Sequence, residues 1–290
     1  MRYLATFDGV AMPKFNPYLE VLCAILIMGS SGAFIKFLAL PPLTLSFFRL
    51  FIPAALLFTY FSISGVNLFR YPVRLMIIGS VLNAARIFFF INSYSYTSIA
   101  NAVIILYTWP VFATVFSMVF LGEKVPRRNL FLLLLPIIGI VLMFVNQPFS
   151  TQNNDFIGMS SMLLSAVIYS STIIIFKKES HKYSGFETVF FQNLAGGFIF
   201  LPFVLNSGLD ISWWQAGSIF VFATMVGILA FGLFFSALKK IKASTVSFMT
   251  YLEVLVASSY GVLLFDETLS WNIIAGGSLI LVSTLLLKKS

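Results

Sequence analysis

Apolar residues along this chain fall into ten long blocks, separated by short polar connections. Each block is close to 20 residues long, about the length of α-helix that crosses a 30 Å hydrocarbon layer. Membrane β-strands would instead alternate apolar and polar residues over about ten positions, and these runs are continuous. The pattern therefore predicts an all-α membrane protein with ten transmembrane helices. The predicted spans are Tyr18–Leu40, Leu43–Ile63, Val73–Tyr94, Ile99–Leu121, Asn129–Val145, Ile157–Phe176, Glu187–Leu205, Trp213–Phe235, Ala243–Phe265 and Trp271–Leu287.

The composition supports a membrane location. Hydrophobic residues make up 59% of the 290 positions, charged residues make up 10%, and the mean hydropathy is +0.98. A soluble globular protein has about 25% charged residues, so this chain has too few to cover a water-facing surface. With one cysteine, Cys23, and one histidine, His181, the chain is expected to have neither an internal disulfide nor a Cys/His metal site.

The basic residues indicate an orientation. When the connections are assigned alternately to two sides, one side receives 15 of the 18 Lys and Arg residues. The opposite connections have no basic residue and contain Asp155, Asp210, Asp266 and Glu267. Basic residues in short loops mark the cytoplasmic side, so we expect both termini to be cytoplasmic. We expect the membrane to be a bacterial inner membrane. The net charge of +8 is then a topology signal, and no nucleic-acid partner is expected.

One turn occurs twice along the chain. "LGEKVPRRN" (Leu121–Asn129) and "LFDETLSWN" (Leu264–Asn272) carry Glu123 and Glu267, 144 positions apart, and only the first is rich in basic residues. Each half has five predicted spans, an odd number, so two copies in series lie upside down relative to each other. We therefore predict two inverted repeats, residues 15–147 (spans one to five) and 155–288 (spans six to ten). Inverted repeats are typical of secondary transporters, whose sites lie near the midplane where the repeats meet.

Three stretches carry a family resemblance. "RLFIPAALL" at Arg49–Leu57, "FLGEKV" at Phe120–Val125 and "LFDETLSWNIIAGGSLILVS" at Leu264–Ser283 resemble the EamA-type drug/metabolite transporter superfamily. The resemblance covers nearly the whole chain and implies transport of a small metabolite, often efflux of an amino acid or a drug, with uptake members also known. One departure is "LFLLLLPIIG" at Leu130–Gly139, where the second half has the glycine pair of "IAGGSL".

Charged residues inside the predicted spans are candidates for substrate binding, since each costs about 2.5–3.5 kcal/mol to insert at the bilayer centre. Arg86 shares a helix face with Asn83, and its guanidinium suits a substrate carboxylate. Glu253 suits a substrate amine or a coupling proton. The alternative for both is an internal Arg86–Glu253 salt bridge. Arg49 either packs against helix ends or lines an outer vestibule.

Span four contains "LYTWPVFAT", in which Pro110 leaves the Leu106 carbonyl without its helical donor and is expected to act as a hinge. In the repeat, Trp109 overlies Glu253 and Tyr107 overlies Tyr251. We therefore predict that Trp109, Tyr107 and Tyr251 form an aromatic wall at the substrate site, with ordinary packing as the alternative.

The sequence lacks the motifs of an enzyme or an ATP-driven pump. It contains neither G-x-x-x-x-G-K-[ST] nor H-E-x-x-H, so no catalytic residue, cofactor or metal is expected. We predict a secondary active transporter that exports an amino acid or a related zwitterionic or cationic solute by alternating access, with protons as the candidate coupling ion. The alternatives are uptake of a metabolite such as S-adenosylmethionine, and a non-transporting membrane scaffold. Monomer and homodimer both remain open.

Overall fold

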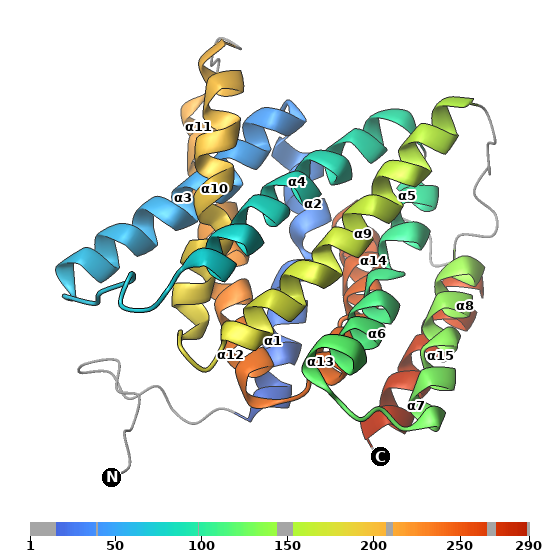
Figure 1. The fold of residues 1–290 in the computed structure, drawn as a ribbon. Coiled ribbons are helices and arrows are strands. Elements are labelled where there is room, and N and C mark those ends of the chain that lie inside the picture. Colours follow the sequence, from blue (N-terminus) through green and yellow to red (C-terminus); the bar gives the residue numbers. More distant parts are fainter. Residues whose placement is uncertain are drawn as a thin grey trace.

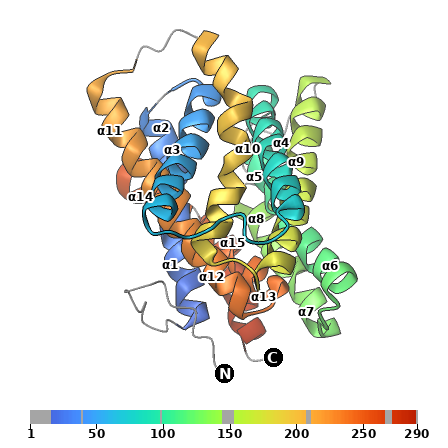
Figure 2. The same cartoon turned by 60° about the vertical axis from the view of Figure 1, so that its left-hand side comes forward.

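A bundle of helices forms the molecule, and Figures 1 and 2 show it from two sides. The computed structural model describes residues 16–38, 40–97, 99–143, 153–206, 211–265 and 271–288, and within these ranges it contains helices and no strand. The all-helical prediction is confirmed. The first half contains α1 (Pro17–Gly29), α2 (Ser31–Leu38), α3 (Pro42–Ile63), α4 (Arg74–Tyr96), α5 (Ile99–Leu106), α6 (Trp109–Leu121), α7 (Arg127–Leu132) and α8 (Leu134–Met143). The second half contains α9 (Asn153–Glu179), α10 (Gly185–Asn206), α11 (Trp213–Phe222), the π-helical segment η1 (Ala223–Ala230), α12 (Phe231–Lys240), α13 (Ala243–Met249), α14 (Leu252–Phe265) and α15 (Trp271–Lys288).

Six helical stretches of the described chain are long and apolar enough to cross a membrane: Leu43–Ile63, Arg74–Ser93, Ala102–Leu121, Phe156–Glu179, Gly185–Asn206 and Trp213–Lys240. Large apolar side chains such as Ile63 and Phe198 remain exposed, as expected for groups that face lipid. The full count of ten crossings and the side on which the termini lie stay predictions. Asp210, Asp266 and Glu267, together with the Asp155 side chain, lie outside the described residues.

The two halves interlock rather than stand apart. The first-half helix α4 lies along the second-half helix α9, as both views show (Figures 1 and 2). The second-half helix α10 packs against α3 and α4, and α1 packs against α12 and α14. The three hydrophobic clusters of the described residues each contain side chains from both halves.

Two predicted spans are interrupted at equivalent points of the repeat. Span four breaks between α5 and α6, next to Pro110. Span nine breaks between α13 and α14, 143 positions further on. The predicted proline hinge is thus a helix break. The second break has no proline: the Tyr251 N–H donates to the Phe248 carbonyl at 3.2 Å, and the Glu253 N–H donates to the Thr250 carbonyl at 2.9 Å. These tighter i to i−3 bonds interrupt the α-helix. Broken helices near the midplane are where transporters build their sites.

A π-helical segment in span eight was not predicted. It faces α3 where Pro53 interrupts the hydrogen bonds of that helix. A Cβ atom on Gly227 would lie 2.6 Å from the Pro53 Cγ atom and 3.4 Å from the Arg49 carbonyl oxygen. Only glycine permits this approach, which brings η1 against the carbonyl that Pro53 leaves without its usual donor.

Helices α8 and α15 cross at a pair of glycines. A Cβ atom on Gly276 would lie 2.2 Å from the Gly139 carbonyl oxygen, and a Cβ atom on Gly139 would lie 2.5 Å from the Gly276 carbonyl oxygen. Close backbone approach at small residues is a common way for membrane helices to associate. The first half therefore contributes one glycine to this contact, although it lacks the glycine pair of the second half.

We expect Gly276→Val to destabilise the protein by about 3 kcal/mol, because the added side chain must push α8 and α15 apart. The measurement is the apparent Tm of the detergent-purified protein, followed by tryptophan fluorescence. Gly217→Val in α11 is the matched control, because a Cβ atom there has nothing within 4 Å. Equal Tm values for the two variants would contradict the close crossing.

Candidate functional site

Arg86 is at the centre of a buried group of side chains from both halves. It lies on α4 with 7% of its surface exposed, and its Cζ atom sits 4.6 Å from the centroid of the Tyr169 ring on α9. Tyr169 also contacts Trp109, the first residue of α6, edge-on at a centroid distance of 4.7 Å with the rings inclined by 61°. The guanidinium, phenol and indole groups therefore form one contiguous cluster. A cation over an aromatic face is favourable, more so when both are desolvated.

Polar groups hold Arg86 in this position. Its Nε atom donates to the Asn83 Oδ1 atom at 3.3 Å, and the Asn83 Nδ2 atom donates to the Gln192 carbonyl on α10 at 3.0 Å. From α9, the Ser165 hydroxyl donates to the Arg86 carbonyl at 3.1 Å. No acceptor among the described residues takes the Nη1 and Nη2 donors of Arg86. The fork of the guanidinium is thus oriented by the protein and remains available for a ligand.

Glu253 and Arg49 complete the charged part of this group. Glu253 is in the first turn of α14, within electrostatic range of both Arg49 and Arg86. The Arg49 Cζ atom lies 5.8 Å from the centroid of the Phe222 ring, at the junction of α11 and η1. Among the described residues, no ion pair or hydrogen bond joins the Glu253 carboxylate to either arginine. The internal Arg86–Glu253 bridge is therefore not formed in this structure.

The predicted aromatic residues fall into two separate groups. Trp109 packs against Tyr169 beside Arg86, whereas Tyr107 and Tyr251 face each other with ring centroids 6.4 Å apart. The Tyr107–Tyr251 pair packs with apolar residues of α7 and α8, including Leu132 and Ile140. The two tyrosines therefore lie at the two helix breaks, and Trp109 is the member of the predicted wall that meets the Arg86 group.

A cavity of about 670 Å³ opens at the basic end of the bundle, which we define as the end carrying the α6–α7, α9–α10 and α12–α13 connections. Met249 and Leu252 line it at its contact with the break in span nine, and Leu252 directly precedes Glu253. Its lining is completed by Tyr18, Leu22, Glu123, Lys124, Val125, Pro126, Asn129, Lys177, Lys240, Ile241, Lys242, Ser244, Thr245, Thr284 and Leu285. The cavity thus connects the basic end with the residues next to Glu253.

Glu123 of the repeated turn joins the two halves beside this cavity. One carboxylate oxygen accepts from the Ala243 N–H at 2.7 Å, and the other accepts from the N–H and the hydroxyl of Ser244 at 3.2 Å and 2.8 Å. Both residues form the first turn of α13, so Glu123 caps a second-half helix from a first-half loop. An acid at a helix N-terminus satisfies backbone donors and complements the helix dipole.

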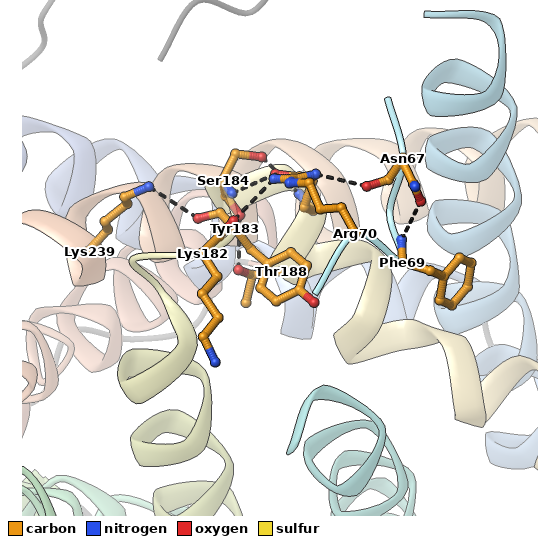
Figure 3. A network of polar contacts seen from close by, with 9 residues as sticks. Asn67, Phe69, Arg70, Lys182, Tyr183, Ser184, Thr188 and Lys239 are labelled. Atoms are coloured by element: carbon orange, nitrogen blue, oxygen red, sulfur yellow. Dashed lines mark hydrogen bonds and ion pairs between the residues drawn. The ribbon is translucent and has the colours of Figure 1, made fainter. Parts of the chain in front are cut away.

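A second polar network at the basic end centres on Arg70, in the connection between α3 and α4 (Figure 3). Its guanidinium forms an ion pair with Glu187 of α10, donates to the Lys182 carbonyl at 3.1 Å, and lies 5.6 Å from the centroid of the Tyr183 ring. The hydrogen bond to Glu187 raises the pKa of Arg70, and burial raises the pKa of the Tyr183 phenol. This network holds the first-half loop on the second half.

Glu187 also stabilises the start of α10. It accepts from the Ser184 N–H at 2.7 Å while its own N–H donates to the Ser184 hydroxyl at 3.2 Å. This reciprocal pair is a capping box at the start of α10. A third carboxylate, that of Glu20 on α1, pairs with Lys240 of α12. Three acids therefore connect the halves at the basic end.

Comparison with known proteins identifies the family. The sequence pattern of the EamA-like transporter family matches residues 16–145 and again residues 156–288. The chain belongs to the EamA-like transporter family. This EamA-like chain is thus a multi-pass membrane transporter built from two repeats, and its family is one of transporters rather than enzymes.

Individual relatives agree with this assignment. The pseudopaline exporter CntI of Pseudomonas aeruginosa is 26% identical to the EamA-like chain over 87% of each sequence. An uncharacterized transporter of Archaeoglobus fulgidus is 29% identical and covers 92% of this chain and 93% of its own. The S-adenosylmethionine uptake transporter of Rickettsia bellii is 20% identical and covers 83% and 81%. One crystal structure has a TM-score of 0.82 at 17% identity, over 94% of this chain and 98% of that one, which shows a shared fold.

Sequence reasoning missed several residues of the site. Tyr169 looks like one more aromatic residue in an apolar run, and nothing in the sequence places it on Arg86. Gln192 does have a signal, since it overlies Arg49 in the repeat with a shift of 143 positions. No sequence pattern reveals that the Glu123 carboxylate accepts from the backbone of α13. This contact depends on how the two halves of the chain fold against each other.

We expect Arg70→Gln to lower the stability of the protein by about 2 kcal/mol, because Glu187 would lose its charged partner while staying buried. The apparent Tm in detergent measures the effect. Arg74→Gln removes the same charge from the same end at an exposed position and should change the Tm little. If Arg74→Gln were as destabilising, the Arg70–Glu187 pair would not be what joins the halves here.

Proposed function

We propose that this EamA-like transporter exports an amino acid or a related solute with separated carboxylate and ammonium groups, by alternating access around Arg86 and Glu253. The observation that carries the proposal is that a buried guanidinium and a half-buried carboxylate, one from each half, lie within electrostatic range of each other without an ion pair or hydrogen bond between them. Charged groups inside a membrane protein are costly, so an unengaged pair is best explained by a ligand that uses both.

Arg86 is suited to the carboxylate of this solute. Asn83 holds its Nε atom and Tyr169 covers one face of its guanidinium, so both Nη atoms keep a fixed direction. Two parallel N–H donors match a carboxylate in bidentate geometry, and the fixed orientation lowers the entropy lost on binding.

Glu253 is suited to the ammonium group. It lies in the half opposite Arg86, so that an amino acid would span the interface between the repeats. When no solute is bound, the same carboxylate is the candidate carrier of a coupling proton. Trp109, which overlies Glu253 in the repeat, contributes an apolar wall rather than a second charge.

The helix breaks support the mechanism of exchange between the two sides. The breaks at α5/α6 and α13/α14 interrupt equivalent spans of the two repeats, so each half has one jointed helix next to the site. Rocking at Pro110 and at Thr250–Tyr251 would open the site to one side while closing it to the other.

We infer the direction of transport from the relatives. The pseudopaline exporter favours efflux, and the S-adenosylmethionine uptake transporter is the observation that favours uptake as the second candidate. S-adenosylmethionine is itself an amino-acid derivative, so both candidates use the same pairing of charges at the site.

Counterflow of labelled amino acids and of S-adenosylmethionine into proteoliposomes tests the proposal. We expect Arg86→Lys to slow transport by about tenfold or more, because a point charge replaces the bidentate fork. Glu253→Gln should slow it to a similar degree and remove any dependence on a proton gradient. Arg74→Lys, at an exposed position, serves as the control.

Unchanged counterflow in both variants would rule out this site. Imposed gradients separate efflux from uptake: transport that runs only into inside-out vesicles indicates efflux, and transport that runs only into right-side-out vesicles indicates uptake.

A further inference from the structure

The cavity at the basic end is lined by an excess of positive charge, from residues that are not part of the Arg86–Glu253 site. Four lysines line it, Lys124, Lys177, Lys240 and Lys242, against one carboxylate, that of Glu123. They come from different parts of the chain: the α6–α7 connection, the last turn of α9, the end of α12 and the α12–α13 connection. Residues that are far apart in the sequence therefore line the same cavity.

The one acid of the lining, Glu123, can offset at most one of these four positive charges, and it lies within electrostatic range of Lys177. Both oxygens of Glu123 are taken by Ala243 and Ser244 at the start of α13. Only Lys240 has a carboxylate partner among the described residues, and this partner is Glu20, which does not line the cavity.

The remaining lysines contact backbone oxygens or no described acceptor. Lys177 donates to the carbonyls of Leu238 and Ile241, and Lys242 donates to the carbonyl of Lys124 at 3.0 Å. Carbonyl contacts hold these ammonium groups in place without cancelling their charge. The cavity is therefore a preorganised region of positive potential.

We infer that this cavity binds a small soluble anion carrying two or more carboxylate or phosphate groups. Its volume of about 670 Å³ is within the range of small-molecule sites, which run from about 300 to 1,000 Å³. Thr245 and Thr284 add hydroxyl groups to the lining, and Met249 and Leu252 bring it to the break next to Glu253. This inference goes beyond the proposed function, because neither Arg86 nor Glu253 lines the cavity, which is therefore a separate site.

Lysines at this end are also expected from the rule that basic loops stay in the cytoplasm. That rule concerns the side of the membrane and not the position within a loop, so it applies equally to Lys178, which neighbours Lys177, is exposed and does not line the cavity. Lys178 is therefore a matched control for charge and topology.

Binding of citrate and pyrophosphate to the purified full-length protein in detergent, measured by isothermal titration calorimetry, tests the inference. We expect Lys242→Gln to weaken binding of both anions by about tenfold, because it removes one charge-assisted contact. Lys177→Gln should weaken the binding of both anions to a similar degree. If Lys177→Gln does not fold because the contact between α9 and α12 is lost, Lys242→Gln alone still tests the inference. Lys178→Gln should bind as the unaltered protein does, and the dication putrescine should not bind.

Equal affinities in Lys178→Gln and Lys242→Gln, or no anion binding at all, would overturn the inference.

Repeating the titration in nanodiscs with and without phosphatidylglycerol distinguishes the source of the anion. Abolition of citrate binding by the anionic lipid would assign the cavity to a lipid headgroup and overturn the soluble-anion assignment. Arg86→Lys and Glu253→Gln should retain citrate binding, so a failure of the proposed transport site is visible separately from a failure of this cavity.

Discussion

The need to pair every backbone N–H and C=O group inside hydrocarbon is the constraint on which the rest of the structure depends. It makes helices the form of each described span, and it confines any departure from the α-helix to places that other helices cover. The breaks at α5/α6 and α13/α14 and the π-helical segment η1 are such departures. Trp109 and Tyr251 at the breaks are buried, and η1 lies against the carbonyl that Pro53 leaves without a donor. The irregular backbone therefore lies next to residues of the candidate site, since Trp109 and Glu253 follow directly after the two breaks.

Carboxylates join the two halves of the chain at the basic end of the bundle. At the basic end, Glu20, Glu123 and Glu187 each connect an element of one half to an element of the other. Each acid is surrounded by Lys or Arg residues or by backbone donors, so its charge is compensated.

The scaffold is symmetric, but the chemistry at its centre is not. The break in span four corresponds to the break in span nine, yet Glu253 corresponds to Trp109, and Arg86 corresponds to Ala230 of η1. A symmetric pair of charges would repel in a desolvated interior. In this structure the guanidiniums of Arg49 and Arg86 belong to one half and the Glu253 carboxylate to the other, so opposite charges lie across the interface between the repeats.

The sequence by itself determined the membrane location, the helical class, the repeat and the family, because these follow from the length of apolar runs and from residue spacing along one chain. It also indicated Pro110 as a hinge and Arg86 and Glu253 as costly charges in apolar spans. Only the tertiary structure decided which side chains meet: Tyr169 on Arg86, Tyr107 with Tyr251 apart from Trp109, and Glu123 on the first turn of α13. Such contacts depend on the rotation and crossing of helices from different halves. Periodicity along one helix shows which residues share a face, but packing against the other helices decides what that face meets.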